Sequence, residues 1–365
     1  MPSVPLRQVI ALVAWAGVAP IHAQSANPAA AAPPSHVATL AAVVVSGVQP
    51  GPGLWKVSGN GHVLWVLGTV SPLPQGMQWR SQQSERVLGD SRELLLQPAL
   101  TVKADVGFLG KLFLLPSAYS ARKNDDGATL QQILPPAVYA RWQMLKQQYI
   151  GSDRAIERWR PMFAARELYH KALKANGLSK TGGVQATVEA VARRLDVKQV
   201  QTGYQVVIAH PRDALKAFRQ SAPHDITCFI RMLDNVEYDM PQIRARANAW
   251  ATGDIPTLRA LPDSAWRDAC VAALADAGFA HTLGLDDLPA KLQAAWLKAA
   301  RTALRDNRQT FAILPMRELL KSDGYLAALK AEHYQVESPA EQDAYPAPAG
   351  SAGIPADASS AAALP

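Results

Sequence analysis

The stretch Leu54–Trp79, LWKVSGNGHVLWVLGTVSPLPQGMQW, constrains the fold of this chain more than any other part of it. Its segments Leu54–Val57 and Val63–Leu67 are rich in β-branched and aromatic residues, which are typical of strands. The tetrapeptide Ser58–Gly61 between them contains an Asn-Gly pair, the dipeptide most favoured in tight hairpin turns. The sequence therefore predicts a β-hairpin whose second strand ends at Gly68–Ser71.

Further strands are expected towards both ends of the folded region, with helices between them. Glu93–Gln97 is a compact apolar run ended by Pro98, and Phe311–Leu314 is a similar run ended by Pro315. Short strands are also expected at Val197–Gln201 and Tyr334–Val336. Helical patterns occur at Trp79–Leu88, Ala137–Gln148, Ala155–Ala175, Val184–Leu195, Pro211–Arg219, Thr227–Val236, Gln242–Thr252, Asp263–Ala277, Pro289–Asn307 and Tyr325–Ala331.

This order of elements predicts an α/β (α+β) fold with a central mixed sheet from N- and C-terminal segments and a large helical middle region. The folded domain is expected to occupy residues 51–337. Residues 24–50 form an Ala/Pro-rich linker, and residues 338–365 have the composition of a disordered low-complexity tail.

Residues 1–23 have the pattern of an export signal. Arg7 precedes the apolar run Val9–Ala19, which is shorter than the about 20 residues needed to span a bilayer. Small residues then lead to Ala23, the expected cleavage point. We therefore expect a periplasmic or secreted protein without a stable transmembrane anchor; the alternative is that the segment is retained as an anchor helix.

Charge and cysteine content narrow the possible functions. The chain carries 37 Lys and Arg against 30 Asp and Glu, but no run of five basic residues, so nucleic acid is not an expected partner. Cys228 and Cys270 are the only cysteines. In an oxidising compartment such an isolated pair is a candidate disulfide, and the alternative is two buried thiols.

Two parts of the chain, Leu54–Gln97 and Arg305–Val336, resemble the TraB/PrgY/GumN family, which includes the Tiki proteases. The family opens with an LWK-like strand, a turn, and a strand that ends in Gly-Thr-x-His before a Leu-Pro pair. Here Gly68-Thr69-Val70-Ser71 precedes Leu73-Pro74. The family closes with a strand that runs into Gly-x-x-His, and Pro315–Glu318 stands in that place. The middle, around Cys228–Asp254, is similar to an exported bacterial branch of the family.

The resemblance implies a divalent metal, such as Mn, Co or Zn, held by the two motif histidines and a strand-end glutamate. The matching positions in this chain are Ser71, Gln97 and Glu318, while Gly68 is retained and Pro315 replaces the glycine of the second motif. A hydroxyl and an amide are weak ligands for such ions, and one carboxylate does not make a hydrolytic site. These residues either form a hydrogen-bonding pocket or are ordinary polar residues at strand ends.

The resemblance and these substitutions therefore predict a non-catalytic TraB/GumN-like protein of the cell envelope that acts by binding. No catalytic residue, metal or cofactor is expected in it. Its expected partner is a peptide, a protein or an envelope polysaccharide. Two alternatives stay open: an active metal-dependent hydrolase or peptidase with ligands recruited from elsewhere, and a haem or other cofactor-binding protein on the same fold.

Overall fold

The computed structural model describes residues 51–105, 107, 116, 117, 119–180, 183–220, 225–261, 270 and 283–344. The predicted signal segment, the linker before residue 51, the helix at 263–277 and the tail after Ala344 lie outside these residues, except for Cys270. In the part of the chain that is described, no helix is long and apolar enough to cross a membrane.

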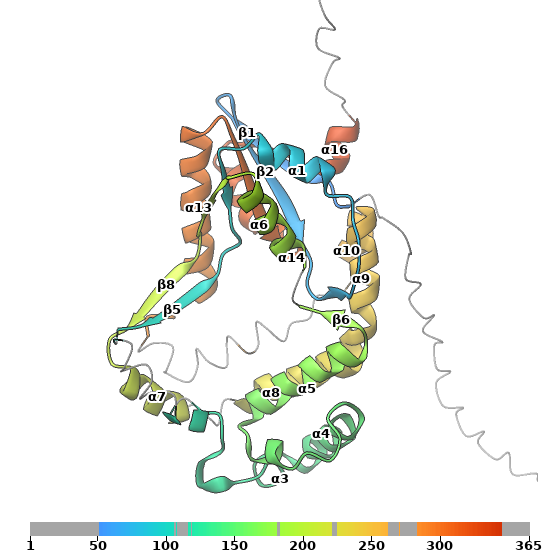
Figure 1. Ribbon diagram of the computed structural model, residues 1–365, viewed down its shortest axis with the longest axis vertical. Coiled ribbons are helices and arrows are strands. Elements are labelled where there is room, and N and C mark those ends of the chain that lie inside the picture. The colour runs from blue at the N-terminus through green and yellow to red at the C-terminus, as the bar shows by residue number, and fades with distance from the viewer. Residues whose placement is uncertain are drawn as a thin grey trace, which may run out of the picture. The chain divides into compact units, whose positions relative to one another are not determined.

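A six-stranded mixed sheet has the strand order β10-β1-β2-β9-β4-β7 (Figure 1). Its strands are β1 (Leu54–Gly59), β2 (His62–Thr69), β4 (Glu93–Leu95), β7 (Lys198–Val200), β9 (Gln309–Pro315) and β10 (Gln335–Glu337). β1 is antiparallel to β10 and β2, whereas β2, β9, β4 and β7 run parallel. The predicted mixed sheet from N- and C-terminal segments is confirmed, and the middle of the chain adds β7 at one edge.

The predicted hairpin joins β1 to β2. Asn60 and Gly61 both have positive φ angles, 52° and 81°, as a two-residue turn of the favoured twist requires. The turn sets the register, with Gly59 opposite His62 and Leu54 opposite Leu67. The sequence signal and the observed pairing therefore agree.

The sheet is covered by helices that bury its apolar residues in what we call the sheet core. Residues 311–314 of β9 are fully buried, as a central parallel strand requires. Figure 1 shows α13 running beside the sheet, and its Trp296 is fully buried in this core. The helices that contribute to this core are α1 (Gln82–Gly89), α6 (Val184–Arg194), α9 (Met240–Thr252), α10 (Ile255–Ala260), α13 (Leu288–Asp306), α14 (Met316–Leu320) and α15 (Tyr325–Ala331).

The middle region has its own buried cluster, the helical core, built around α4, α5 and α8 (Figure 1). Its centre includes Trp142, Leu168 and Phe229, all fully buried. The elements of this region are η1 (Asp125–Gly127), α3 (Leu130–Ile133), α4 (Pro136–Tyr149), η2 (Ala155–Arg158), α5 (Pro161–Ala175), α7 (Pro211–Gln220), α8 (Asp225–Asp234), η4 (Asn235–Asp239), α9 (Met240–Thr252) and α10 (Ile255–Ala260).

The single helix expected at 155–175 is divided into η2 and α5. Pro161 has no backbone N–H to continue a preceding helix, and its fixed φ suits the first position of a new one. Two small sheets were not predicted. β5 (Leu100–Ala104) pairs in parallel with β8 (Tyr204–Ile208), and β3 (Leu73–Pro74) pairs with β6 (Leu178–Ser179).

The ordered chain also extends past residue 337, where the sequence had placed the start of the disordered tail. The short helix α16 (Pro339–Ala344) follows β10. The Ser338 N–H donates to Glu341 Oε2 at 2.6 Å, and Gln342 Nε2 donates to the Leu54 carbonyl at 2.8 Å. This capping interaction and the contact with β1 hold a segment whose composition alone favours disorder.

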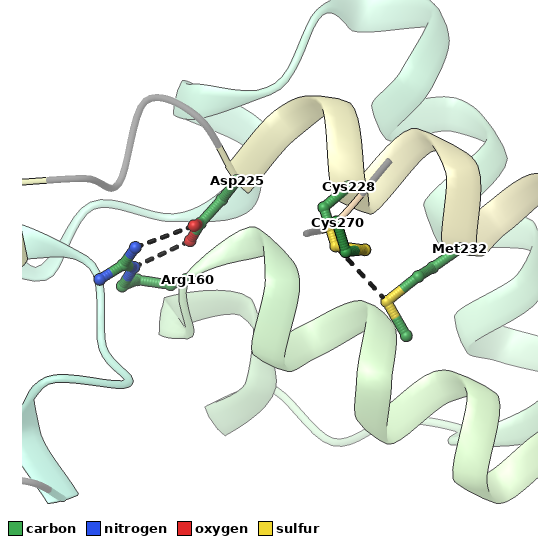
Figure 2. The surroundings of a disulfide bond; sticks show 5 residues. All are labelled: Arg160, Asp225, Cys228, Met232 and Cys270. Carbon is green, nitrogen blue, oxygen red and sulfur yellow. Dashed lines mark hydrogen bonds and ion pairs between the residues drawn. A yellow bond between two sulfur atoms is a disulfide. The ribbon is translucent and has the colours of Figure 1, made fainter. Parts of the chain in front are cut away.

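The predicted Cys228–Cys270 disulfide is confirmed, with Cα atoms 4.5 Å apart (Figure 2). Cys228 lies on α8 and is buried in the helical core. Figure 2 shows the bridge near the N-terminal end of α8, where Asp225 faces Arg160 of the segment before α5. The disulfide therefore links Cys270 to the N-terminal end of α8, where the Arg160–Asp225 ion pair also lies.

Candidate functional site

A cavity of about 1110 Å³ lies at the carboxyl edge of the parallel strands. Thr69, Ser71 and Pro72 reach it from the end of β2, Gln97 from the end of β4, and Pro315 from the end of β9. Parallel β2, β9 and β4 direct their carboxyl ends to one edge, the usual position of ligand sites in open α/β sheets. Residues from α5, α6, η4, α9, α10 and α14, and Lys180 after β6, contribute most of the remaining lining.

The structure brings together three of the residues singled out in the sequence, Ser71, Gln97 and Pro315. Thr69 and Pro315 are register partners in the β2–β9 ladder, which brings these two strand ends side by side. Glu318 is not among the lining residues. It lies in the short helix α14, which already begins at Met316, and its carboxylate is 3.3 Å from Arg317 Nε and 3.1 Å from Lys321 Nζ.

Gly68 contributes space and not a functional group. A Cβ atom at this position would lie 2.5 Å from Met316 Cε and 2.9 Å from Leu319 Cδ1 of α14. The Gly68 carbonyl accepts a hydrogen bond of 2.7 Å from Trp250 Nε1 on α9. Glycine here therefore permits the close approach of α14 to the end of β2.

The strand-end polar residues differ in what they contact. Gln97 donates through Nε2 to Oε1 of Gln185, in the first turn of α6, and Gln185 in turn donates to Glu189 at 2.7 Å. Ser71 is exposed on the cavity wall, and the peptide bond that joins it to Pro72 is cis. The Gln97 amide is thus part of a chain of side-chain hydrogen bonds that connects β4 to α6.

The donor set at this edge does not fit the divalent metal that the resemblance implies. The family positions present a hydroxyl and an amide to the cavity, and the third position, Glu318, lies outside the lining. Among the described residues, Glu189 is the one acid of the lining, and no histidine contributes to it. Among the residues that the structure describes, no group of three or more His, Cys, Asp or Glu residues is placed to hold a metal ion.

Sequence reasoning missed the basic character of the cavity. Five basic side chains line it: Lys180, Arg246, Arg259, Arg317 and Lys321. These residues are spread along the sequence from Lys180 to Lys321, so no local motif identifies them. The Arg259 guanidinium also donates to the Leu320 carbonyl at 3.1 Å, and Lys180 Nζ lies 4.3 Å from the centre of the Tyr169 ring.

Asn235 is a second residue that the sequence did not reveal. It begins η4, a single π-helical turn between α8 and α9, and lines the cavity while only 3% exposed. Its Nδ2 donates to Asp239 Oδ2 at 3.0 Å, but its buried Oδ1 has no hydrogen-bond partner. Single π-helical turns are frequent at functional sites, and this one places Asn235, with its unpaired acceptor, in the wall of the cavity.

Two groups near the cavity have shifted pKa values. The pKa of the Tyr325 hydroxyl is raised to about 12, first by burial and then by the Glu318 carboxylate, while Arg317 opposes the shift. The pKa of His170 on α5 is lowered, first by burial and then by the positive charges of Lys180 and Arg166. Tyr325 is therefore neutral at ordinary pH and His170 is biased towards its neutral form.

Comparison with known proteins identifies the family of the chain. The TraB/PrgY/gumN family matches the chain over residues 53–338, a span that includes every strand from β1 to β10. No curated protein and no solved structure matches the chain. Because this match covers most of the chain and the whole central sheet, the protein is a member of the TraB/PrgY/gumN family.

Proposed function

We propose that this family member is an exported binding protein, related to the Tiki-like metallopeptidases but without metal-dependent hydrolysis at the family's ligand positions. The observation that carries the proposal is the donor set at the carboxyl edge of the sheet, where Ser71 and Gln97 stand at two of the three ligand positions. Neither side chain supplies the imidazole or carboxylate that a hydrolytic metal needs.

The cavity itself supports a role in binding. Its volume of about 1110 Å³ suits a peptide or a component of the cell envelope, and it occupies the edge at which open α/β sheets bind their ligands. The Cys228–Cys270 disulfide supports export to an oxidising compartment, such as the periplasm. Function is argued here from the site, because a shared fold does not by itself carry an activity.

Metal analysis of the purified protein tests the proposal directly. After exposure to Mn²⁺, Co²⁺ or Zn²⁺ and removal of free metal, we expect no stoichiometric metal and no chelator-sensitive peptidase activity. Stoichiometric metal whose removal abolishes peptide hydrolysis would overturn the proposal and support the alternative of an active hydrolase with ligands from elsewhere.

A pair of restored variants sharpens the ligand assignment. Ser71→His and Gln97→Glu are combined either with Glu318→His, the position that matches the family motif, or with Arg317→His, the neighbour that lines the cavity. Because Glu318 lies outside the lining, we expect the variant with Arg317→His to gain more affinity for Zn²⁺, measured by competition with a chromogenic chelator. Equal affinity in the unmodified protein would show that Ser71 and Gln97 are not the ligand positions.

A further inference from the structure

We propose that the cavity recognises the free carboxyl terminus of a peptide, with the basic side chains facing its carboxylate and Asn235 Oδ1 accepting a hydrogen bond from its backbone N–H. The inference rests on the proposed binding function and names the chemistry of its ligand. Three observations carry it: the charge of the lining, two buried polar atoms without hydrogen-bond partners, and the apolar share of the wall.

The charge of the lining favours an anionic ligand. Five Lys or Arg side chains line the cavity against the single acid Glu189. Glu189 is also 3.9 Å from Arg193, which offsets part of its charge. Glu318 lies within 3.3 Å of Arg317 and Lys321 and neutralises part of the basic charge. Among the described residues, the five basic side chains of the lining still outnumber Glu189, Glu318 and Asp239, the acids in the lining or bonded to it. A cavity of one sign with low-dielectric walls attracts ligands of the opposite charge.

The first turn of α6 adds to this preference. Gly183 at its N-cap and the first helical residues, Val184 and Gln185, line the cavity, so the positive end of the helix dipole lies there. No side chain caps this N-terminus, and its first turn carries no acidic residue. The backbone N–H groups at such a helix start are suited to bind a carboxylate.

Two buried polar atoms of the lining residues indicate which hydrogen-bonding groups the ligand carries in addition to its charge. Asn235 Oδ1 is a buried acceptor without a partner, and Arg317 Nε is a buried donor that makes no hydrogen bond, although it lies 3.3 Å from Glu318. Buried polar groups are nearly always hydrogen-bonded, so an unpaired donor and an unpaired acceptor on two residues that line one cavity point to a ligand with both functions.

The hydrogen bond from Asn235 Nδ2 to Asp239 determines which polar atom of Asn235 stays without a partner. Because Nδ2 is used, the free position of Asn235 is an acceptor, and only a ligand with an N–H or O–H group can satisfy it. Sulfate or chloride has no such donor. The last residue of a peptide carries a carboxylate and a backbone N–H within a few bonds of each other, which matches both needs.

The remaining wall favours a peptide over an acidic oligosaccharide, which also combines carboxylates with donors. Apolar residues also line the cavity, Ile243, Leu258 and Met316 among them, and such walls suit peptide side chains. Sugar sites commonly use aromatic rings, whereas Tyr169 is the one aromatic residue among the described residues of this lining.

The experiment compares two libraries on the full-length protein. One is a randomised N-acetylated hexapeptide library with free carboxyl termini, and the other is the same library as C-terminal carboxamides. Peptides retained by the protein in gel filtration at low ionic strength are counted by mass spectrometry. We expect the free acids to be retained about tenfold or more above the carboxamides, since a hydrogen-bonded charge is lost on amidation. A third probe, trigalacturonate, presents carboxylates and hydroxyls on a sugar.

Variants locate the binding. Arg317→Gln and Asn235→Asp are each expected to weaken retention of the free acids by about tenfold, the first by removing a positive charge and the second by adding a negative one. Arg305→Gln is the matched control, because Arg305 is exposed on α13, outside the cavity lining, and should leave retention unchanged. If Asn235→Asp fails to fold, as judged by circular dichroism, Arg317→Gln still tests the assignment.

The outcomes separate this inference from the proposed function. Equal retention of acids and carboxamides, or retention of trigalacturonate alone, overturns the carboxyl-terminal assignment but leaves a binding function in place. Failure to retain any free-acid peptide also overturns the assignment. Chelator-sensitive cleavage of the library peptides would instead overturn the proposed non-catalytic function.

Discussion

The sheet core and the helical core contain similar apolar side chains but are held together differently. In the sheet core, residues 311–314 of β9 are buried between β2 and β4, and backbone hydrogen bonds join strands that are distant in the sequence. In the helical core, α5 and α8 have no such ladder between them. Two side-chain links lie at one end of α8 instead: the buried Arg160–Asp225 ion pair and the Cys228–Cys270 disulfide (Figure 2).

The difference follows from backbone chemistry. A strand satisfies its N–H and C=O groups on its neighbours, so pairing and packing stabilise the sheet together. A helix satisfies them internally and contacts its neighbours through side chains alone. The helical core should therefore depend strongly on a few side-chain links, whereas the sheet core spreads its stability over many contacts.

The largest effect is expected from loss of the buried ion pair. Asp225→Ala leaves Arg160, whose side chain is 1% exposed, without the carboxylate that contacts both its Nε and Nη2 at 2.8 Å. Removing one partner of a buried pair costs about 3–5 kcal/mol, because the other charge stays buried. Urea unfolding should show a loss of this size in the free energy of unfolding.

The matched control for this variant lies on α5. Lys171→Ala removes an ion pair with Glu167 that is 3.8 Å long and largely exposed. Such pairs contribute little, so a change within about 0.5 kcal/mol is expected. A similar loss in both variants would contradict the special role of the buried pair in the helical core.

The disulfide is expected to have the next largest effect. It closes a loop with a sequence separation of 42 residues, and native disulfides of this kind stabilise a fold by about 2–4 kcal/mol. Cys228→Ala combined with Cys270→Ala should lower the urea midpoint accordingly. Reductant should lower the midpoint of the unmodified protein towards the same value and leave the double variant unchanged; an effect of reductant on the double variant would show that the assay reports something else.

A smaller loss is expected in the sheet core from Gly68→Ala. The added methyl group would meet the ends of the Met316 and Leu319 side chains, which can shift in part. Overpacking of this kind costs about 1–3 kcal/mol. Gly89→Ala is the control: Gly89 is exposed at the last residue of α1, and the nearest atom to the added Cβ, Leu195 Cδ1, is at an ordinary contact distance of 3.5 Å. A loss at Gly89 as large as at Gly68 would contradict the packing explanation.

The sequence predicted those parts of the fold whose signals are local. The Asn60-Gly61 turn and the apolar run of β9 each lie within a few residues, and both elements are observed. The β5–β8 pair was missed because its partners are about a hundred residues apart and Val102 and Val207, on the two strands, are exposed. A parallel pair of this kind has neither a turn signal nor a buried alternating face.

The candidate site shows the same limit. Strand-end reasoning identified Ser71, Gln97 and Pro315, which meet at one cavity because their strands are parallel neighbours. Counting along the motif identified Glu318, but α14 begins at Met316 and Glu318 lies outside the lining. The basic residues and Asn235 could not be found from spacing, because only the tertiary fold and a π-helical turn bring them together.

The smallest effect is expected from the positive charge of the cavity wall on the pKa of His170, a residue of α5. The pKa of His170 on α5 lies below its ordinary value of 6.5 because of burial and of the positive charge of Lys180, which lines the cavity. Between pH 6.5 and this lower native pKa, the unfolded chain binds more protons than the folded one. Stability contributed by neutral His170 is therefore present above pH 6.5 and falls as the pH drops through this window.

Titration of the His170 ring by NMR checks the sign and the cause together. The midpoint should lie below 6.5 in the unmodified protein and move towards 6.5 in Lys180→Gln, which removes one positive neighbour. His170→Gln should flatten the pH dependence of the urea midpoint in the same window. A His170 midpoint above 6.5, or one that Lys180→Gln leaves unmoved, would show that the basic wall of the cavity does not act on α5, and the two regions would then be electrostatically independent at this contact.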